Sequence, residues 1–258
     1  MALITFMSDF GTVDHYVAAV KAAIVSESPN QPITDITHDI RPFDISHAAN
    51  VLRNVYKDFP EKTVHIVAVD AMREKSKALA VEIDGHLFVG FDSGIFSLIS
   101  EKKPDAIAFL ENGQSTFPAK DVLAKVALRL ANGKSLKDVG EMADSMTVLY
   151  ARQLKVTKRE IAGHIVTVDH YGNLITNINK TAFDKILEIN GAGVRYAIRF
   201  GREQFQGLHS YFSDVESGDC YVMFNSSGHL QIGINKGNAS ELLGLSVDSP
   251  VLIEFANR

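Results

Sequence analysis

The first 150 residues alternate short apolar runs with segments of helical periodicity, and this alternation restricts the possible fold more than any other feature of the chain. Apolar runs over residues 2–7, 33–36 and 63–69 are typical of buried strands, because they are short and end in polar residues. Between them, residues 14–28 and 45–56 carry apolar side chains at helical spacing. Strands that alternate with helices predict an α/β domain with a mainly parallel sheet.

Two carboxylates directly follow predicted strands of this domain. In parallel sheets, ligands bind beyond the carboxyl ends of the strands, and both Asp9 and Asp70 lie at such ends. Asp9 could accept hydrogen bonds from a vicinal diol such as a ribose, but the pattern alone favours an Asx turn that closes the strand. Asp70, followed by Arg73 and Lys75, could position a water molecule or lie in a solvated loop with weak ion pairs.

Turn and cap residues predict further elements of the same domain. The dipeptide Asp84-Gly85, between two apolar runs, predicts a tight β-hairpin. Helices are expected over residues 94–100 and 121–132. Asp121 would cap the second helix, because an aspartate can accept hydrogen bonds from the free amides of a first helical turn.

The pattern changes after about residue 154 to short apolar or alternating runs separated by Gly, Asn and Ser. These runs cover residues 163–168, 195–200, 220–224, 230–234 and 251–255. They predict a small antiparallel, β-barrel-like domain. We therefore expect an α/β domain over residues 1–154, a β-rich domain over 161–258 and a linker over 155–160.

Turns of the second domain also carry polar side chains. Asp169 and Asn173 flank a glycine turn and could hold an ammonium group. The hydroxyl-rich turn at residues 225–228, with Asn235 after the next strand, could form a concave site for a carboxylate. Each pattern is also typical of an ordinary tight turn or hairpin. No one of these clusters establishes a site by itself.

Composition excludes several classes of function. The 258 residues carry a net charge of −5 and no basic stripe, so a nucleic-acid partner is not expected. No apolar run approaches the length of a membrane span, and no signal peptide is expected at the N-terminus. With Cys220 alone, no intramolecular disulfide can form, which fits a cytoplasmic protein. The histidines show no zinc-like spacing, so no metal site is expected.

In their order along the chain, the clusters resemble the S-adenosylmethionine (SAM) hydroxide adenosyltransferase family, which is related to the SAM-dependent fluorinase and chlorinase. The resemblance extends over almost the whole chain, and the ordered set of motifs is specific although each motif alone is weak. The matching motifs are Phe6-Met7-Ser8-Asp9-Phe10-Gly11, Asp35-Ile36-Thr37-His38-Asp39-Ile40, Pro42-Phe43-Asp44, Phe88-Val89-Gly90-Phe91-Asp92-Ser93-Gly94, Gly172-Asn173-Leu174-Ile175-Thr176-Asn177, Phe212-Ser213-Asp214-Val215 and Asn225-Ser226-Ser227-Gly228.

The resemblance implies a displacement at C5′ of SAM, in line with the departing sulfur. Water or hydroxide attacks the carbon, and the products are adenosine and L-methionine. Methionine leaves as a neutral thioether, so the protein mainly has to align and partly desolvate the nucleophile. The resemblance further implies SAM as substrate with no cofactor, and a homotrimer whose sites lie between the N-terminal domain of one subunit and the C-terminal domain of the next.

The resemblance also implies substrate contacts at matching positions of this chain. Asp9 would hold the ribose hydroxyls, and Phe43 would pack near the ribose and the methionine chain. Phe212 would stack on adenine, and Asn235 would contact the adenine edge. Asp169 and Asn173 would bind the methionine ammonium, and Ser226 would bind its carboxylate. This set joins a diol acceptor, an ammonium acceptor and a carboxylate donor, which are the groups that SAM requires.

The catalytic residues match the family only in part. In the hydroxide branch of the family that this chain resembles, an Asp-Arg-His triad positions water. Asp70 matches the aspartate of that triad. No arginine falls at the matching place in the following loop, where Arg73 and Lys75 are the candidates to replace it, although the two cations differ in geometry. Pro118 stands at the histidine position, and its side chain cannot polarise water.

Three functions therefore stay open. The first is SAM hydrolysis, with Asp70 alone or with Arg73 or Lys75 orienting the water. The second is binding of SAM or adenosine without turnover. The third, adenosyl transfer to a halide, is the least favoured, because the Asp70 carboxylate would repel an incoming anion. Ala119, at the position of the small residue that lines the halide pocket in the halogenating relatives, offers no hydroxyl.

Overall fold

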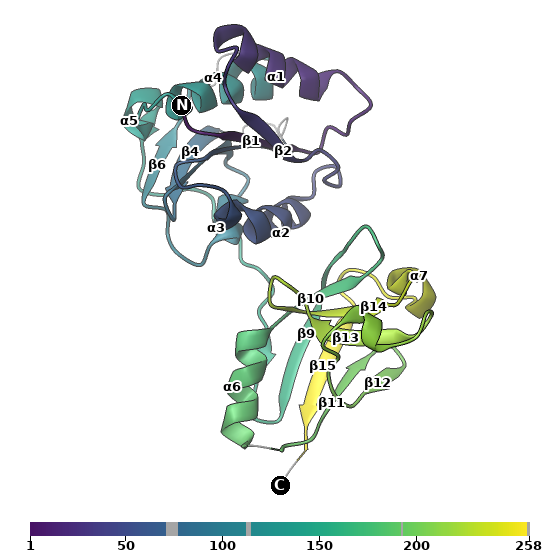
Figure 1. Cartoon of the computed structure of the whole chain (residues 1–258). Coiled ribbons are helices and arrows are strands. Elements are labelled where there is room, and N and C mark those ends of the chain that lie inside the picture. The colour runs from purple at the N-terminus through teal and green to yellow at the C-terminus, as the bar shows by residue number, and fades with distance from the viewer. Residues whose placement is uncertain (71–76, 112–114, 192, 257–258) are drawn as a thin grey trace. The chain divides into compact units, whose positions relative to one another are not determined.

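The chain divides into two compact units in the computed structural model (Figure 1). The units are Met1–Ala151 and Arg152–Arg258. The structure describes residues 1–70, 77–111, 115–191 and 193–256. Each unit has hydrophobic core residues of its own, so the two are described separately.

A mixed β-sheet forms the centre of the N-terminal unit. Among the described residues its strands are, in spatial order, β2 (Ile33–Thr37), β1 (Ile4–Ser8), β3 (Val64–Ala68), β5 (His86–Phe91), β4 (Ala78–Ile83), β6 (Ala106–Phe109) and β7 (Glu141–Met142). The run from β2 to β5 is parallel, and β4, β6 and β7 continue the sheet in antiparallel fashion. The predicted α/β class is thus confirmed, and the parallel part contains the strands that precede Asp9 and Asp70.

Helices cover both faces of this sheet (Figure 1). One face carries α1 (Tyr16–Glu27) and α4 (Ala124–Ala131), and the other carries α2 (Ile45–Val55) and α3 (Phe96–Ile99). The shorter helical segments are η1 (Tyr56–Asp58), η2 (Ala119–Leu123) and α5 (Leu136–Val139). Because side chains alternate along a strand, β1 directs Phe6 into the core of the first face and Met7 into the core of the second.

The hairpin predicted at Asp84-Gly85 is confirmed. Ile83 pairs with His86 across the turn, and Asp84 and Gly85 have φ angles of 52° and 77°. Two positive φ angles in succession give a turn whose twist matches that of the flanking strands. The local sequence is therefore sufficient to determine the register of β4 against β5.

The cap predicted at Asp121 is wrong. The helical segment begins at Ala119, directly after Pro118, whose φ of −61° suits the start of a helix. Asp121 therefore lies inside the first turn. Its carboxylate accepts a hydrogen bond from the Ser115 hydroxyl at 2.6 Å and so ties the preceding loop to η2.

In the C-terminal unit, the described strands form an antiparallel sheet. Their order is β12 (Glu203–Phe205), β11 (Tyr196–Phe200), β15 (Pro250–Phe255), β9 (Glu160–Val168), β10 (Leu174–Asn179), β14 (His229–Ile234) and β13 (Cys220–Phe224), with β8 (Lys155–Val156) paired to β9. The sheet is barrel-like and nearly closed around its apolar side chains, which confirms the predicted fold class of this domain. Short helical segments η3 (Phe212–Asp214) and α7 (Ala239–Leu243) connect its strands.

Helix α6 (Lys180–Asn190) is an element that the sequence pattern does not predict. It begins directly after β10, where the Asn179 side chain accepts a hydrogen bond from the Ala182 amide at 2.7 Å. Phe183 and Ile186 are its buried side chains. A stripe this narrow gives weak helical periodicity, and the helix depends on packing against the barrel.

A buried histidine pair crosses the parallel part of the N-terminal sheet. His65 on β3 is fully buried; its Nδ1 lies 2.7 Å from the Thr5 hydroxyl and its Nε2 lies 3.2 Å from Nδ1 of His86. Desolvation, with a smaller contribution from the neighbouring His86, lowers the pKa of His65 from 6.5 to about 3. The folded protein therefore keeps this ring neutral throughout the mildly acidic range.

This pair makes stability depend on pH. In the unfolded chain His65 takes up a proton near pH 6.5, whereas in the folded chain it does so only near pH 3. The unfolded state thus binds more protons in between, and the free energy of unfolding falls as the pH falls. From pH 7 to pH 5 we expect a loss of about 2 kcal/mol from this residue, measured by urea denaturation. The non-titrating His65→Gln protein, compared by its pH slope, should show a flatter dependence; equal slopes would contradict the assignment.

Candidate functional site

Three neighbouring parallel strands bring three of the predicted site residues to one edge of the N-terminal sheet. Asp9 follows β1, Asp70 comes shortly after β3, and Phe43 lies in the loop between β2 and α2. Parallel neighbours end at the same edge of a sheet, so the loops that follow them meet there. This agrees with the expectation that Asp9 and Asp70 lie at the carboxyl ends of strands.

The Asp9 carboxylate joins the other two loops. Its Oδ2 accepts a hydrogen bond from the Phe43 amide at 2.9 Å and one from the Asp70 amide at 3.1 Å. Phe43 and Asp70 both have left-handed backbones, with φ angles of 66° and 51°. This conformation is unfavourable for a bulky residue such as Phe43 and needs support from its surroundings. Among the described residues, none donates a hydrogen bond to Asp9 Oδ1, which leaves that oxygen available to a ligand.

A cavity of about 300 Å³ opens beside Asp9. Its lining consists of Asp9, Phe10, Tyr16, Pro42, Phe43, Thr116, Phe117, Pro118 and Ala119. The rings of Phe10, Tyr16 and Phe117 contact one another, with centroids 5.5 to 5.9 Å apart. The cavity is therefore a mainly aromatic and apolar space with one carboxylate in its wall. Such a space suits a sugar ring and a thioether chain held by a few polar contacts.

The remaining catalytic candidates lie around this cavity or outside the described residues. Asp70 is half-buried, and its amide is held by Asp9. Arg73 and Lys75 lie outside the described residues. Pro118 directly precedes η2 and lines the cavity. The structure thus brings Asp9, Phe43 and Pro118 to one cavity, with the amide of Asp70 bonded to Asp9 beside it.

In the C-terminal unit, Asp169 organises the loop between β9 and β10. Its Oδ1 accepts hydrogen bonds from the amides of Tyr171 and Asn173, both at 2.9 Å. Its Oδ2 accepts one from the Asn173 side chain at 2.8 Å. The two residues predicted to bind an ammonium are therefore bonded to each other. Gly172, between them, has a φ of 83° and lies against the Asn238 side chain, where a Cβ would collide.

Two further side chains that sequence reasoning missed support Asn173, Tyr221 directly and Gln231 through Tyr221. The Tyr221 hydroxyl donates a hydrogen bond to Asn173 Oδ1 at 3.0 Å, and it accepts one from Gln231 at 3.1 Å. Tyr221 and Gln231 lie on neighbouring strands, β13 and β14. Because the strands are far from the loop in sequence, no local signal could have found this contact. The network fixes the orientation of the Asn173 amide.

Asn235 and Phe212 lie at the same end of the barrel as Asp169. The Asn235 side chain donates to the Val215 carbonyl at 2.9 Å, next to η3, which carries Phe212. The Phe212 side chain is exposed and thus available to stack on a planar group. The pairing of Leu174 with Ile232 places the Asp169 loop beside the C-terminal end of β14, near Asn235.

β13 and β14 form a hairpin, and Ser226 lies at the end of it that is far from Asn235. The turn at residues 225–228 joins β13 to β14, and Phe224 pairs with Leu230 next to it, whereas Cys220 pairs with Ile234 at the far end. The Asn225 carboxamide shapes this turn by accepting hydrogen bonds from the amides of Ser227 and His229, at 3.1 and 3.0 Å. The fold therefore separates Ser226 from the Asp169 loop within one C-terminal unit.

The described parts of the chain contain no group of three or more His, Cys, Asp and Glu side chains arranged to hold a metal ion. In the same residues, no helix has the length and apolar character required to cross a membrane.

Comparison with protein families gives two matches. The model of the SAM hydroxide adenosyltransferase N-terminal domain matches residues 4–140, and that of the C-terminal domain of the same family matches residues 163–252. These matches cover both structural units in the family's domain order.

Individual relatives agree with this result. An (R)-S-adenosyl-L-methionine hydrolase from Thermus thermophilus is 29% identical over 97% of this chain and 99% of its own length. One of the same name from Methanocaldococcus jannaschii is 30% identical over 94% of this chain and 92% of its own. A fluorinase from Actinoplanes is 25% identical over 90% of this chain and 91% of its own.

A solved structure also matches both units. The crystal structure of an uncharacterized conserved protein from Thermotoga maritima superposes with a TM-score of 0.87, at 32% identity, and covers 97% of this chain and 99% of that one. The fold, the two domain matches and the relatives aligned over nearly the full length confirm the resemblance noted in the sequence. The chain belongs to the SAM hydroxide adenosyltransferase family.

Proposed function

We propose that this protein hydrolyses SAM to adenosine and L-methionine by in-line attack of water or hydroxide at C5′. The observation that carries the proposal is the placement of Asp9, which lines the cavity and holds the loops of Phe43 and Asp70 by one oxygen. The names of the Thermus and Methanocaldococcus relatives, which are (R)-S-adenosyl-L-methionine hydrolases, support the same reaction.

The proposed mechanism relies on alignment. Oδ1 of Asp9 accepts a hydrogen bond from a ribose hydroxyl. Phe43 and the aromatic side chains that line the cavity pack on the ribose and the thioether chain. Asp70 orients the attacking water, whose oxygen bonds to C5′ as the C5′–S bond breaks, and the proton that the water loses passes to the Asp70 carboxylate or to solvent. Because methionine leaves as a neutral thioether, no acid is needed at the leaving group. Since Pro118 cannot polarise water, Asp70 performs this role alone or with Arg73 or Lys75.

The C-terminal contacts form the second part of the proposal. We place Asp169, Asn173, Phe212 and Asn235 against SAM in a cytoplasmic homotrimer, in which the N-terminal unit of one subunit faces the C-terminal unit of the next. The carboxylate role of Ser226 stays a prediction.

The test is a product analysis in water enriched in ¹⁸O. The protein is incubated at neutral pH with each sulfonium epimer of SAM in turn, and adenosine and methionine are followed by chromatography. We expect equimolar products, with one ¹⁸O atom at the 5′ position of adenosine and turnover of the (R) epimer. SAM binding without product, seen by calorimetry, would support a binding protein instead. A 5′-halonucleoside whose yield rises with halide concentration would support adenosyl transfer to a halide.

A further inference from the structure

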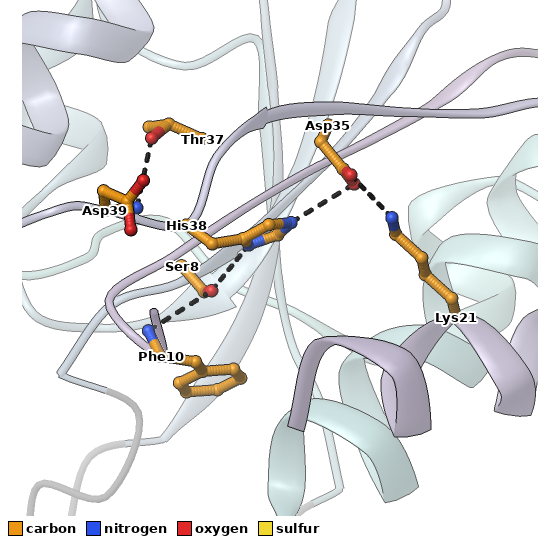
Figure 2. Close-up of polar contacts among 7 residues, drawn as sticks. All are labelled: Ser8, Phe10, Lys21, Asp35, Thr37, His38 and Asp39. Atoms are coloured by element: carbon orange, nitrogen blue, oxygen red, sulfur yellow. Dashed lines mark hydrogen bonds and ion pairs between the residues drawn. The ribbon is translucent and has the colours of Figure 1, made fainter. Parts of the chain in front are cut away.

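The side chain of a buried histidine contacts Ser8, the residue that precedes Asp9 (Figure 2). His38 follows β2, is 5% exposed, and packs edge-on against the ring of Phe6, with centroids 4.7 Å apart. It belongs to no cavity wall among the described pockets. Any role of His38 in the site must therefore act through the residues that it contacts.

His38 binds the turn on both sides of Asp9. Its ring Nδ1 lies 2.8 Å from the Ser8 hydroxyl, and its main-chain carbonyl accepts the Gly11 amide at 2.8 Å. The Ser8 oxygen also accepts a long hydrogen bond from the Phe10 amide, at 3.4 Å. The residues before and after Asp9 are thus tied to one histidine, as Figure 2 shows for the Ser8 contacts.

An acidic partner orients the histidine ring. Asp35 on β2 lies 3.2 Å from His38 Nε2 and 2.6 Å from the Lys21 ammonium. At this distance the carboxylate interacts electrostatically with Nε2, which has no hydrogen-bond partner among the described residues. Partial burial alone would raise the pKa of Asp35, but the contacts with Lys21 and His38 outweigh it and lower the pKa. An ionised Asp35 favours the proton on Nε2, so Nδ1 accepts the hydrogen bond from the Ser8 hydroxyl.

The order serine, histidine, aspartate does not make this cluster a hydrolytic triad. Ser8 is fully buried and does not line the cavity beside Asp9. A nucleophile must reach the substrate, and this hydroxyl is enclosed by the first strand. Both Ser8 hydrogen bonds stay within the turn and the histidine, which is the arrangement of a structural support.

We propose that His38 is a positioning residue of the site: through Ser8 and Gly11 it fixes the turn that carries Asp9, and through Asp9 it fixes the loops of Phe43 and Asp70. The chain of contacts runs without a break from His38 to the amides of those two loops. The catalytic part of this inference rests on the proposed hydrolysis, whereas the part that concerns the binding of a nucleoside does not.

The test compares Ser8→Ala with a matched control on the adjoining strand. Ser8→Ala removes the side-chain link and keeps the His38 carbonyl bond. Thr37→Val removes a similar hydroxyl, which accepts a hydrogen bond from the Asp39 amide at 3.1 Å (Figure 2). We expect Ser8→Ala to lower kcat/KM for SAM and the affinity for adenosine by about tenfold each, the effect of one lost hydrogen bond. Thr37→Val should leave both within about twofold.

A double-mutant cycle separates positioning from a general loss of stability. If the Ser8–His38 contact carries the effect, Ser8→Ala combined with His38→Phe should bind adenosine no more weakly than His38→Phe alone. His38→Asn, which keeps an acceptor near the Nδ1 position, should recover part of the affinity. Additive losses, or wild-type affinity in Ser8→Ala, would overturn the inference. If the unmodified protein binds adenosine but releases none from SAM, the hydrolysis proposal fails while this cycle can still be measured by calorimetry.

Discussion

Replacement of Asp9 by alanine is expected to lower kcat/KM for SAM by about 1,000-fold, which corresponds to about 4 kcal/mol. Part of the loss is the charge-assisted hydrogen bond between Oδ1 and a ribose hydroxyl, which contributes about 1.5–3 kcal/mol. The rest follows from the amides of Phe43 and Asp70, which lose their shared acceptor. Without it, Phe43 can leave its left-handed conformation, and displacement of reacting groups by about 1 Å can cost about 100-fold.

The matched variant is Asp9→Asn. Its carboxamide oxygen can still accept hydrogen bonds from the amides of Phe43 and Asp70, so the two loops should keep their positions. The contact to the ribose loses its charge. We expect Asp9→Asn to weaken the binding of SAM and of adenosine alike, with a smaller effect on kcat than Asp9→Ala. Calorimetry with both ligands and steady-state kinetics supply the comparison. An Asp9→Ala protein with unchanged adenosine affinity would show that the ribose assignment is wrong.

Asp70→Asn is expected to abolish most of the turnover and to leave SAM bound. A positioned acid–base group contributes about 10²–10⁴-fold to a rate, and we expect kcat to fall by at least about 100-fold. Asparagine is chosen because it tolerates the left-handed backbone, which has a φ of 51° at this residue. Alanine there would add strain. The Asp70 amide can still donate to Asp9, so the loop should stay in place.

The control for Asp70→Asn is Asp39→Asn, which removes an exposed charge from the neighbouring loop. Single-turnover measurements with bound SAM separate the chemical step from binding. We expect the dissociation constant of SAM to change by less than about threefold in Asp70→Asn, since the predicted contact is to water and not to substrate. Equal turnover in the two variants would remove Asp70 from the mechanism and direct attention to Arg73 and Lys75.

The part of the site that follows from strand ends could be predicted from the sequence. Asp9 and Asp70 each come after a run of buried residues, and parallel neighbours place such positions at one edge. The contact between them, across 61 residues, confirms that reasoning. The Asp84-Gly85 turn was equally accessible, because a two-residue hairpin has a strong local signal.

Other features depend on contacts that no local pattern encodes. Ser8 and His38 are 30 residues apart, and their contact exists only because β1 and β2 are neighbours in the sheet. The left-handed backbone of Phe43 contradicts its own preference and is imposed by Asp9. In the second unit, Tyr221 reaches Asn173 across 48 residues through strand pairing. Sequence reasoning identifies residue types at chain positions, whereas these contacts arise from tertiary packing.

The conformation of Pro118 has a consequence for how this family can change over evolutionary time. Its φ of −61° and ψ of −30° belong to the ordinary right-handed helical region, which every L-amino acid adopts. The amides of Lys120 and Asp121 bond to the Phe117 carbonyl, so the first turn is formed without any contribution from an amide at position 118. A histidine could occupy the position with the same backbone, and codons for proline and histidine can differ by one nucleotide. A lineage with this scaffold can therefore exchange the two residues in a single mutational step, in either direction, without a change of backbone conformation at that position.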